Sequence, residues 1–502
     1  MSTTLTDRPR RRLLAGGFAS SLALVLAASP ASAEPAETAP PEHPATLAPR
    51  TDLANGQKRP PQDYDGRTRH TSAAEALLWI PRILLSPLYV VTEYGLRKPL
   101  GAVDGAVEKA SLIPKAIDFL TFGPNNNAGI VPTAFVDFGF RPSIGVYFFY
   151  DDFLAPHNDL RFTISTGGEK YLKAKLADRI PLRVLKNEAG DFDVKTYLQL
   201  EVDALERPDF VFFGVGPESR YVDRGRFEER TVGGGARLHS DFWKGSFFES
   251  WLTIRGQDFA DGDCAGPTLR PATGELACSV YDILRQVEAG RYPLPPGFGG
   301  YGSVKGGGRL VLDSRKPRPF KGTGVAVDVR SEVGGAFGGS VGGWLSYAAS
   351  AAGFVDLTGT RRVLGLTLET RFVDPLRHAF EIPFTELVGA PRTDYVPDDD
   401  MMRGFVPGRL LGRSSVSATL DYEWPVWSYF DGTVQLAAGN VFGEHLQDFK
   451  PDLTRLSFVA GLTSPSSRDH GFNFLLGFGT KTIHDHATPE SVRFYLGGTT
   501  GF

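Results

Sequence analysis

From about residue 129 onward, the chain consists of segments in which apolar and polar residues alternate. Residues 191–204 form the clearest segment, with apolar side chains at nearly every second position and mostly charged ones between them. A period of two places the two kinds of side chain on opposite faces of a β-strand. The same pattern recurs in segments 160–165, 172–176, 364–372 and 415–423. The pattern predicts an all-β region of strands and turns.

The two faces of these strands differ, because one is continuously apolar and the other is heavily charged. In a soluble secreted sandwich the apolar faces would meet in a core, whereas in a transmembrane barrel they meet lipid and the charged faces line the lumen. The strands have about ten residues, the length that a tilted span requires. The sequence therefore predicts an antiparallel transmembrane β-barrel over residues 127–502, and counting allows about twelve to sixteen strands.

The last alternating segment bears on how this barrel closes. Val492, Phe494 and Leu496 alternate with polar residues, and the segment runs to Phe502. We therefore expect it to close the barrel against a first strand at about 129–138. Gly497, Gly498 and Gly501 would leave that seam weakly packed, since glycine has no side chain to pack.

Three segments precede the predicted barrel. Residues 1–33 combine a cluster of arginines, an apolar run at 13–28 and a small-residue cleavage site, which together are typical of an export signal. Residues 34–71 are rich in proline and alanine and read as a periplasmic linker. Residues 72–122 carry three helical patterns interrupted by prolines. We expect short helices that lie along the inner membrane–water interface, plug the barrel mouth or pack as a small cap on its end.

Composition and charge argue against several classes of protein. After the export signal, no run of about 18 apolar residues predicts a transmembrane helix. The net charge of −4 gives no support to nucleic-acid binding. The chain has 36 Phe and 58 Gly against 3 Met and 2 Cys, which suits an exported, aromatic-rich β-protein better than a cytosolic enzyme.

The two cysteines, Cys264 and Cys278, share one polar segment that contains glycine and proline. In an oxidising compartment we expect them to form a local disulfide. The long connections of such barrels face outward, so we place the disulfide in an outward loop. A metal-binding or catalytic role is the alternative, and no histidine lies near them in the sequence to support it.

Catalytic motifs were sought along the whole chain. His484-Asp485-His486 offers two potential metal ligands but lies in a turn before Pro489 and has no visible third ligand. The glycine runs 233–235 and 306–308 precede strands rather than helices, so they do not form a phosphate-binding loop. Serines are frequent, but none has an evident histidine and aspartate partner in the sequence. We therefore expect no catalytic residue, no metal, no cofactor and no enzymatic activity.

One long connection contains the sequence Arg403-Gly404-Phe405, just upstream of the alternating strand 415–423. That strand carries Asp421 and Glu423 on its polar face. A guanidinium that leaves water needs a carboxylate, which its planar fork can hold with two hydrogen bonds. We expect the connection to fold back into the barrel, with Arg403 bound to Asp421, Glu423 or both. Gly404 would permit a tight bend and Phe405 would wedge the tip against the wall.

These segments occur in an order that resembles the last third of the BamA/TamA family of outer-membrane proteins, the bacterial surface antigen superfamily. The segments that carry the resemblance are 307–315, 382–387, 402–405, 420–426, 438–442 and the terminal Phe502. The resemblance implies sixteen strands, an Arg-Gly-Phe loop inside the lumen and a C-terminal barrel signal made by Phe494, Leu496 and Phe502. It also implies the outer membrane of a Gram-negative bacterium, with lipid and unfolded polypeptides as partners, and a role in inserting outer-membrane proteins or translocating a polypeptide.

The chain departs from this family in two places. Its N-terminal region shows helical patterns but no strand pattern of POTRA domains, the modules with which family members receive client chains. Ala437 stands where the family has an aspartate that binds the loop arginine. The alternative function is therefore a passive pore or a structural outer-membrane barrel that has no assembly activity.

Overall fold

The computed structural model describes residue 81 and residues 119–123, 126–137, 139–186, 192–262, 282–315, 322–338, 341–389, 402–427, 430–464 and 471–499. The predicted export signal (1–33), the linker (34–71) and nearly all of the predicted helical region (72–122) lie outside the described residues. Cys264, Cys278 and Phe502 also lie outside them, so the disulfide and the terminal part of the barrel signal stay predictions.

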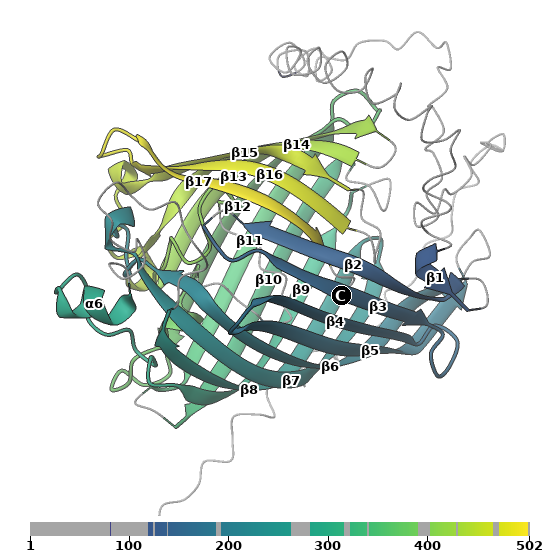
Figure 1. Ribbon diagram of the computed structural model, residues 1–502. Coiled ribbons are helices and arrows are strands. Elements are labelled where there is room, and N and C mark those ends of the chain that lie inside the picture. Colours follow the sequence, from purple (N-terminus) through teal and green to yellow (C-terminus); the bar gives the residue numbers. More distant parts are fainter. Residues whose placement is uncertain are drawn as a thin grey trace, which may run out of the picture. The chain divides into compact units, whose positions relative to one another are not determined.

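The described chain folds into one closed antiparallel sheet of sixteen strands, β2 to β17, with a two-residue strand β1 (Thr121–Phe122) beside β2 (Figure 1). Each strand pairs with the next along the chain, and β17 pairs with β2. The predicted barrel and its sixteen strands are therefore confirmed. The strands are β2 (Ala128–Asp137), β3 (Ser143–Asp151), β4 (Asp159–Gly168), β5 (Tyr171–Lys186), β6 (Phe192–Phe212), β7 (Gly225–Trp243), β8 (Ser246–Asp261), β9 (Tyr301–Asp313), β10 (Gly324–Phe337), β11 (Trp344–Asp356), β12 (Val363–Pro375), β13 (Ser414–Trp427), β14 (Phe430–Phe442), β15 (Arg455–Thr463), β16 (Gly471–Thr482) and β17 (Pro489–Thr499).

The helices of the described region are short and lie in the connections. They are α6 (Ile283–Glu288), η4 (Tyr221–Asp223), η5 (Phe384–Glu386), η6 (Glu444–Leu446) and η7 (Pro451–Leu453). Within this region, no helix is long and apolar enough to cross a membrane.

The alternation seen in the sequence separates the two surfaces of the sheet. On β8, Leu252 and Ile254 are 61% and 58% exposed on the outer face, whereas Thr253 and Arg255, which alternate with them, are buried on the inner face. Apolar side chains outside and polar ones inside are the reverse of a water-soluble protein, and they suit a barrel surrounded by lipid.

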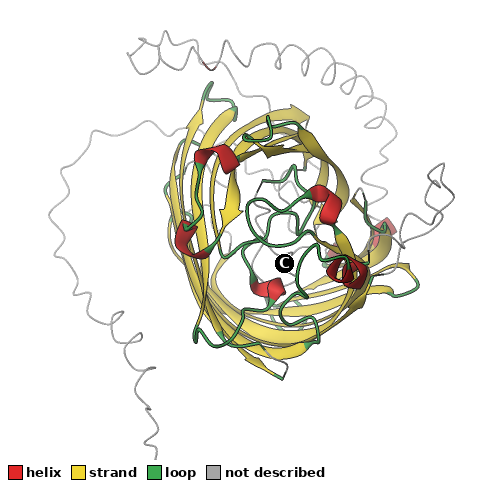
Figure 2. Cartoon of the chain, turned by 90° about the vertical axis from the view of Figure 1, so that its left-hand side faces the viewer, coloured by secondary structure: helices red, strands yellow, loops and turns green. Residues whose placement is uncertain are grey.

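The two ends of the barrel differ. At the end where β2 stops and β3 starts, which we call the loop end, β8 and β9 are separated by residues 262–300 and β12 and β13 by residues 376–413. At the opposite end the β7–β8 connection is Lys244-Gly245. In Figure 2, several loops of the loop end cross the opening of the ring of strands, and short helices lie along its rim.

Apolar side chains fill much of the loop end. Phe384 of η5 is 2% exposed and packs edge-on against Phe212, Phe227 and Phe259, with ring centroids 5.8, 5.3 and 5.0 Å away. We call this group and its buried neighbours the apolar cap. It joins the first part of the β12–β13 connection to β6, β7 and β8, so this first part turns inward instead of projecting into solvent.

Candidate functional site: the inward loop and the seam

The second part of the β12–β13 connection, residues 402–411, lies against the inner face of β15, β16 and β17; we call it the inward loop. The Gly404 amide donates to Ser457 Oγ at 2.8 Å, and Ser491 Oγ donates to the Gly404 carbonyl at 3.3 Å. A Cβ at Gly404 would lie 2.3 Å from the Phe478 carbonyl oxygen, so only glycine fits this approach. The loop thus occupies the lumen, where the resemblance placed it.

The wall of β14 and β16 gives the loop an apolar seat. Met402, Phe405 and Leu410 are buried and form one cluster with Ala437 and Val441 of β14. The Phe405 ring also covers Gly479 of β16, where a Cβ would come within 2.4 Å of the ring. The Phe405 ring therefore packs against Ala437 and Gly479, whose small size leaves room for it.

The structure corrects the partner expected for Arg403. Its side chain is exposed, and no hydrogen bond or ion pair between described residues joins it to Asp421 or Glu423. Asp421 accepts a hydrogen bond from Gln435 Nε2 at 2.8 Å, across the β13–β14 pair.

The register of the strands explains the difference. The loop tip binds at Ser457, which lies in one row with Ala437 and Thr419 across β15, β14 and β13. Asp421 lies on β13, two strands from Ser457, and it is the next inward-facing residue after Thr419. It is therefore roughly 10 Å from Ser457 across the strands and roughly 7 Å along them. The nearer position on β14 is Ala437, which offers the loop an apolar contact instead of a carboxylate.

A different arginine of the loop is buried among polar groups. Arg409 is fully buried, and its Nε donates to Glu490 Oε1 of β17 at 2.6 Å. Its Nη1 and Nη2 donate to Ser219 Oγ and to the Ser219 carbonyl, each at 2.7 Å. Burial and the nearby Arg455 lower the pKa of Arg409 to about 10, which leaves the guanidinium charged at neutral pH. Arg409 therefore ties the loop to β17 and to the β6–β7 connection.

Glu490 holds a second arginine as well. Arg455 Nη1 lies 3.2 Å from Glu490 Oε2, and Arg455 Nη2 donates to the Ser219 carbonyl at 2.9 Å. Glu490 faces inward because of a bulge, since the pairing steps from Gly479–Ser491 to Thr480–Pro489 and leaves Glu490 as the extra residue of β17. Two buried cations thus share one carboxylate and the carbonyl groups of the β6–β7 connection.

The barrel closes where β2 meets β17, and we call this pair of strands the seam. Only Asp137, Val136 and Phe135 of β2 have register partners on β17 among the described residues, namely Tyr495, Leu496 and Gly497. On its other side β2 pairs with β3 from Ala128–Tyr150 through Phe135–Ser143. Near its start, β2 pairs instead with β1 at Ala128 and Gly129.

A proline marks β2 as an edge-like strand. Pro132 lies in register with Val146 of β3, and no bulge interrupts that pairing. On the seam side of β2, Pro132 lies between the residues that pair with β1 and those that pair with β17. Pro181 and Pro425 of β5 and β13, by contrast, lie at register shifts. A proline cannot donate to a ladder, so a strand that carries one in its middle suits an edge.

A buried ion pair crosses the seam. Arg493 of β17 donates from Nε and Nη2 to Oδ1 and Oδ2 of Asp137 at 3.3 and 3.1 Å, and the side chains are 7% and 2% exposed. The third nitrogen, Nη1, donates to the Phe405 carbonyl of the inward loop at 3.3 Å. Inward loop, last strand and first strand therefore meet at one guanidinium.

Arg409, Glu490, Arg493 and Asp137 were not among the site residues predicted from the sequence. A signal existed for one pair, because Arg493 stands between Val492 and Phe494 and Asp137 ends the first strand, so opposite charges fall on the polar faces of the two closing strands. Nothing in the alternation indicated Glu490, because a bulge interrupts the period there.

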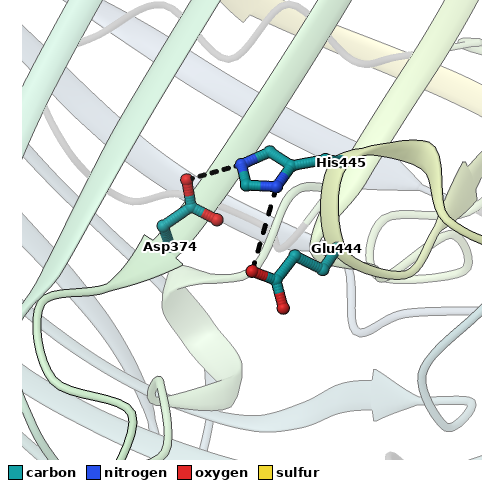
Figure 3. A group of neighbouring side chains, drawn as sticks. All are labelled: Asp374, Glu444 and His445. Carbon is teal, nitrogen blue, oxygen red and sulfur yellow. Dashed lines mark hydrogen bonds and ion pairs between the residues drawn. The ribbon is translucent and has the colours of Figure 1, made fainter.

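One cluster at the loop end has the composition of a metal site. Asp374, Glu444 and His445 lie together, with His445 Nε2 3.0 Å from Asp374 Oδ2 and Nδ1 3.8 Å from Glu444 Oε1 (Figure 3). Arg413 binds both carboxylates, at 3.3 Å to Asp374 and 2.9 Å to Glu444. This arginine already balances the charge that a metal would neutralise, so we read the cluster as an ion-pair network.

The class that this fold defines is a closed sixteen-stranded β-barrel with an inward-folded loop. No protein-family model and no curated protein matches the sequence. Among solved structures, the chain is similar to BamA from Haemophilus ducreyi lacking POTRA domains 1–3, with a TM-score of 0.46 and 13% identity over 74% of this chain and 70% of that one.

Two further solved structures also match the chain. CdiB from Acinetobacter baumannii has a TM-score of 0.43 and 9% identity, over 74% of this chain and 60% of that one. OccK5 (OpdH) from Pseudomonas aeruginosa has a TM-score of 0.28 and 11% identity, over 74% of this chain and 96% of that one. At these values the likeness carries no functional argument.

Proposed function

We propose that this protein is an outer-membrane barrel that acts on polypeptides, aiding the insertion of outer-membrane proteins or the translocation of a chain. The observation that carries the proposal is the seam, where β2 and β17 pair at three positions only in the described part of the chain. A strand edge that lacks a partner exposes backbone N–H and C=O groups, which can template an incoming strand.

The outer-membrane location rests on the surface of the barrel. Leu252 and Val325 are about as exposed as residues on a soluble surface, at 61% and 60%, yet they are apolar and belong to a face that continues around the sheet. Such a face is stable in lipid and would aggregate in water. Lipid is thus the first partner that we propose, and the polypeptide client is the second.

The apolar cap favours this function over that of a passive pore. A steadily conducting pore needs a continuous polar path, whereas Phe384 and its aromatic neighbours form a packed apolar layer at the loop end. The proposed activity also requires no catalytic residue, metal or cofactor, because it consists of strand pairing.

A disulfide across the seam tests the proposal. Val136 and Leu496 are register partners on the outer face, so Val136→Cys with Leu496→Cys should staple the seam. Val146→Cys with Ile164→Cys is the matched control, because these residues are outer-face register partners on β3 and β4. Both pairs are made with Cys264→Ser and Cys278→Ser, which removes competing thiols.

The readout is the inventory of folded outer-membrane proteins in cells depleted of the native protein and supplied with each variant. We expect the seam staple to mimic depletion, with recovery on mild reduction, and the control staple to behave as the unstapled protein. A staple that forms fully and leaves the inventory unchanged contradicts the proposal. A steady planar-bilayer conductance that is indifferent to the staple would instead support the passive pore.

A further inference from the structure

We propose that Arg493 couples the inward loop to the seam, so that the seam stays closed while the loop is seated and is released when the loop leaves. The proposal rests on the proposed function for the use made of an open seam. The coupling itself is a property of the barrel and can be measured without any client.

The first step is that side chains as well as backbone hold the seam. In the described part of the chain three paired positions form its ladder, and the Arg493–Asp137 pair adds two parallel hydrogen bonds. Beside this pair the rings of Phe135 on β2 and Tyr495 on β17 meet edge-on, with centroids 5.3 Å apart. Arg493 also lies over the Tyr495 ring at 5.6 Å.

The second step is that the loop tip completes the surroundings of the same guanidinium. Nη1 of Arg493 donates to the Phe405 carbonyl, while Nε and Nη2 bind Asp137. A guanidinium is planar and rigid, so the Phe405 carbonyl and the Asp137 carboxylate fix its orientation together. If either the Phe405 carbonyl or the Asp137 carboxylate is removed, the Arg493 guanidinium is less well oriented toward the acceptor that remains.

The third step concerns water. The Arg493 and Asp137 side chains are only 7% and 2% exposed, and the loop tip contacts Arg493 through the Phe405 carbonyl. Charges attract strongly in such a site and weakly once water reaches them. Departure of the loop would hydrate the pair and weaken the seam, and opening of the seam would by the same linkage weaken the seat of the loop.

The fourth step is that three hydrogen bonds fasten the loop to β17, the strand that would move, in addition to its contacts with Ser457 of β15 and with Ser219. Arg409 binds Glu490, Gly404 binds Ser491, and Phe405 binds Arg493, and all three acceptor or donor side chains belong to β17. Of these three residues, Arg493 has hydrogen bonds to β2 in the described part of the chain, through Asp137. It is therefore the residue through which the position of the loop can be transmitted to the seam.

The test measures the width of the seam in the purified full-length protein in phospholipid vesicles. Spin labels are placed at Ile144→Cys on β3 and Phe474→Cys on β16, two exposed outer-face positions on the strands that flank the seam, with Cys264→Ser and Cys278→Ser. Three strand spacings separate these strands, so a closed seam gives a distance of about 15 Å. An open seam adds a longer distance.

Four variants separate the steps. Asp137→Asn and Arg493→Lys weaken the pair directly, and we expect them to raise the long-distance fraction at least about tenfold. Gly404→Ala and Arg409→Gln unseat the loop without touching β2, and we expect a rise of about fivefold or more. Two loop variants are used so that poor folding of one leaves the other informative.

The matched control is Asp203→Asn. Asp203 binds Arg255 at 2.9 Å, in a buried pair between β6 and β8, far along the sheet from the seam. We expect no change in the seam distance. An equal rise for Asp203→Asn would mean general loosening and would overturn the proposal.

Two other outcomes also overturn it. An unchanged distance in Asp137→Asn would show that the ion pair does not close the seam. An unchanged distance in both loop variants, with hydrogen exchange showing that residues 402–411 have left their seat, would show that loop and seam are independent. If the coupling holds but the stapled seam supports normal insertion in cells, the coupling stands and the proposed function fails.

Discussion

The seam and the wall of β6, β7 and β8 close the same barrel by different means. On the wall, β6 and β7 pair from Thr196–Ser240 to Phe212–Gly225, with one irregularity. At the seam, the described strands pair at three positions and carry a buried ion pair beside them. Both places contain a buried aspartate–arginine pair, yet the wall would remain paired without its own.

This difference shows where side chains decide the behaviour of a β-barrel. A strand in a long ladder loses only a small share of its hydrogen bonds when one side-chain contact is removed. A strand with a short ladder depends on its side chains, so the same substitution should have a larger effect there. Matched substitutions at the seam and away from it should therefore differ in their effect on stability.

The largest effect is expected at Glu490. Glu490→Gln leaves Arg409 and Arg455 buried without a carboxylate, and we expect it to lower the free energy of unfolding by about 3–5 kcal/mol. The matched control is Glu369→Gln, since Arg330 and Arg371 share Glu369 in the same way.

The control differs in its exposure and place. The Glu369 side chain is 17% exposed and lies in the wall of β10 to β12, whereas that of Glu490 is 6% exposed. Water should reduce the loss in Glu369→Gln to about 1 kcal/mol. Urea unfolding of the two barrels in the same detergent measures the difference, and equal losses would contradict the contrast between the regions.

The fold could be predicted from the sequence because the pattern that specifies it lies within each strand. Alternation along each strand, as in 415–423, assigns side chains to the two faces without any knowledge of neighbouring strands. The closing role of the last strand and the inward position of the loop containing Gly404 also follow from patterns that can be read in order along the chain.

The partners of the loop could not be predicted in the same way, because register and bulges decide them. Which row of β13 faces Ser457 depends on the pairing of three strands, and this row contains Thr419 instead of Asp421. Glu490 faces inward only because one extra residue interrupts the period of β17. The sequence predicted Arg403 as the buried cation and gave no indication of Arg409, because alternation along the strands does not distinguish two arginines of one loop.

An intermediate effect is expected at Gly404. Gly404→Ala places a Cβ 2.3 Å from the Phe478 carbonyl oxygen and 2.5 Å from Ser457 Oγ, so the loop must shift. We expect a loss of about 1–3 kcal/mol and faster amide exchange in residues 402–411. Gly335→Ala on β10 is the matched control, because its Cβ would meet nothing within 4 Å. Similar exchange in both variants would show that the seat of the loop tolerates more volume than its geometry implies.

The smallest effect is expected at Arg403, the arginine that the sequence pattern singled out. Its side chain is exposed, and the described residues give it no ion pair with Asp421 or Glu423. Arg403→Ala should therefore change the free energy of unfolding by no more than about 0.5 kcal/mol, as is usual for surface substitutions.

Arg409→Ala, in the same loop, removes a fully buried guanidinium and leaves Glu490 and the Ser219 carbonyl with fewer donors. Urea unfolding of the two variants compares an exposed with a buried cation on one segment. A large loss of stability in Arg403→Ala would support the ion pair with Asp421 or Glu423 that the sequence predicted. If Arg403→Ala leaves the stability unchanged but impairs the insertion of outer-membrane proteins, Arg403 contacts the polypeptide client. An exposed cation that does not stabilise the barrel would then act through its contact with that client.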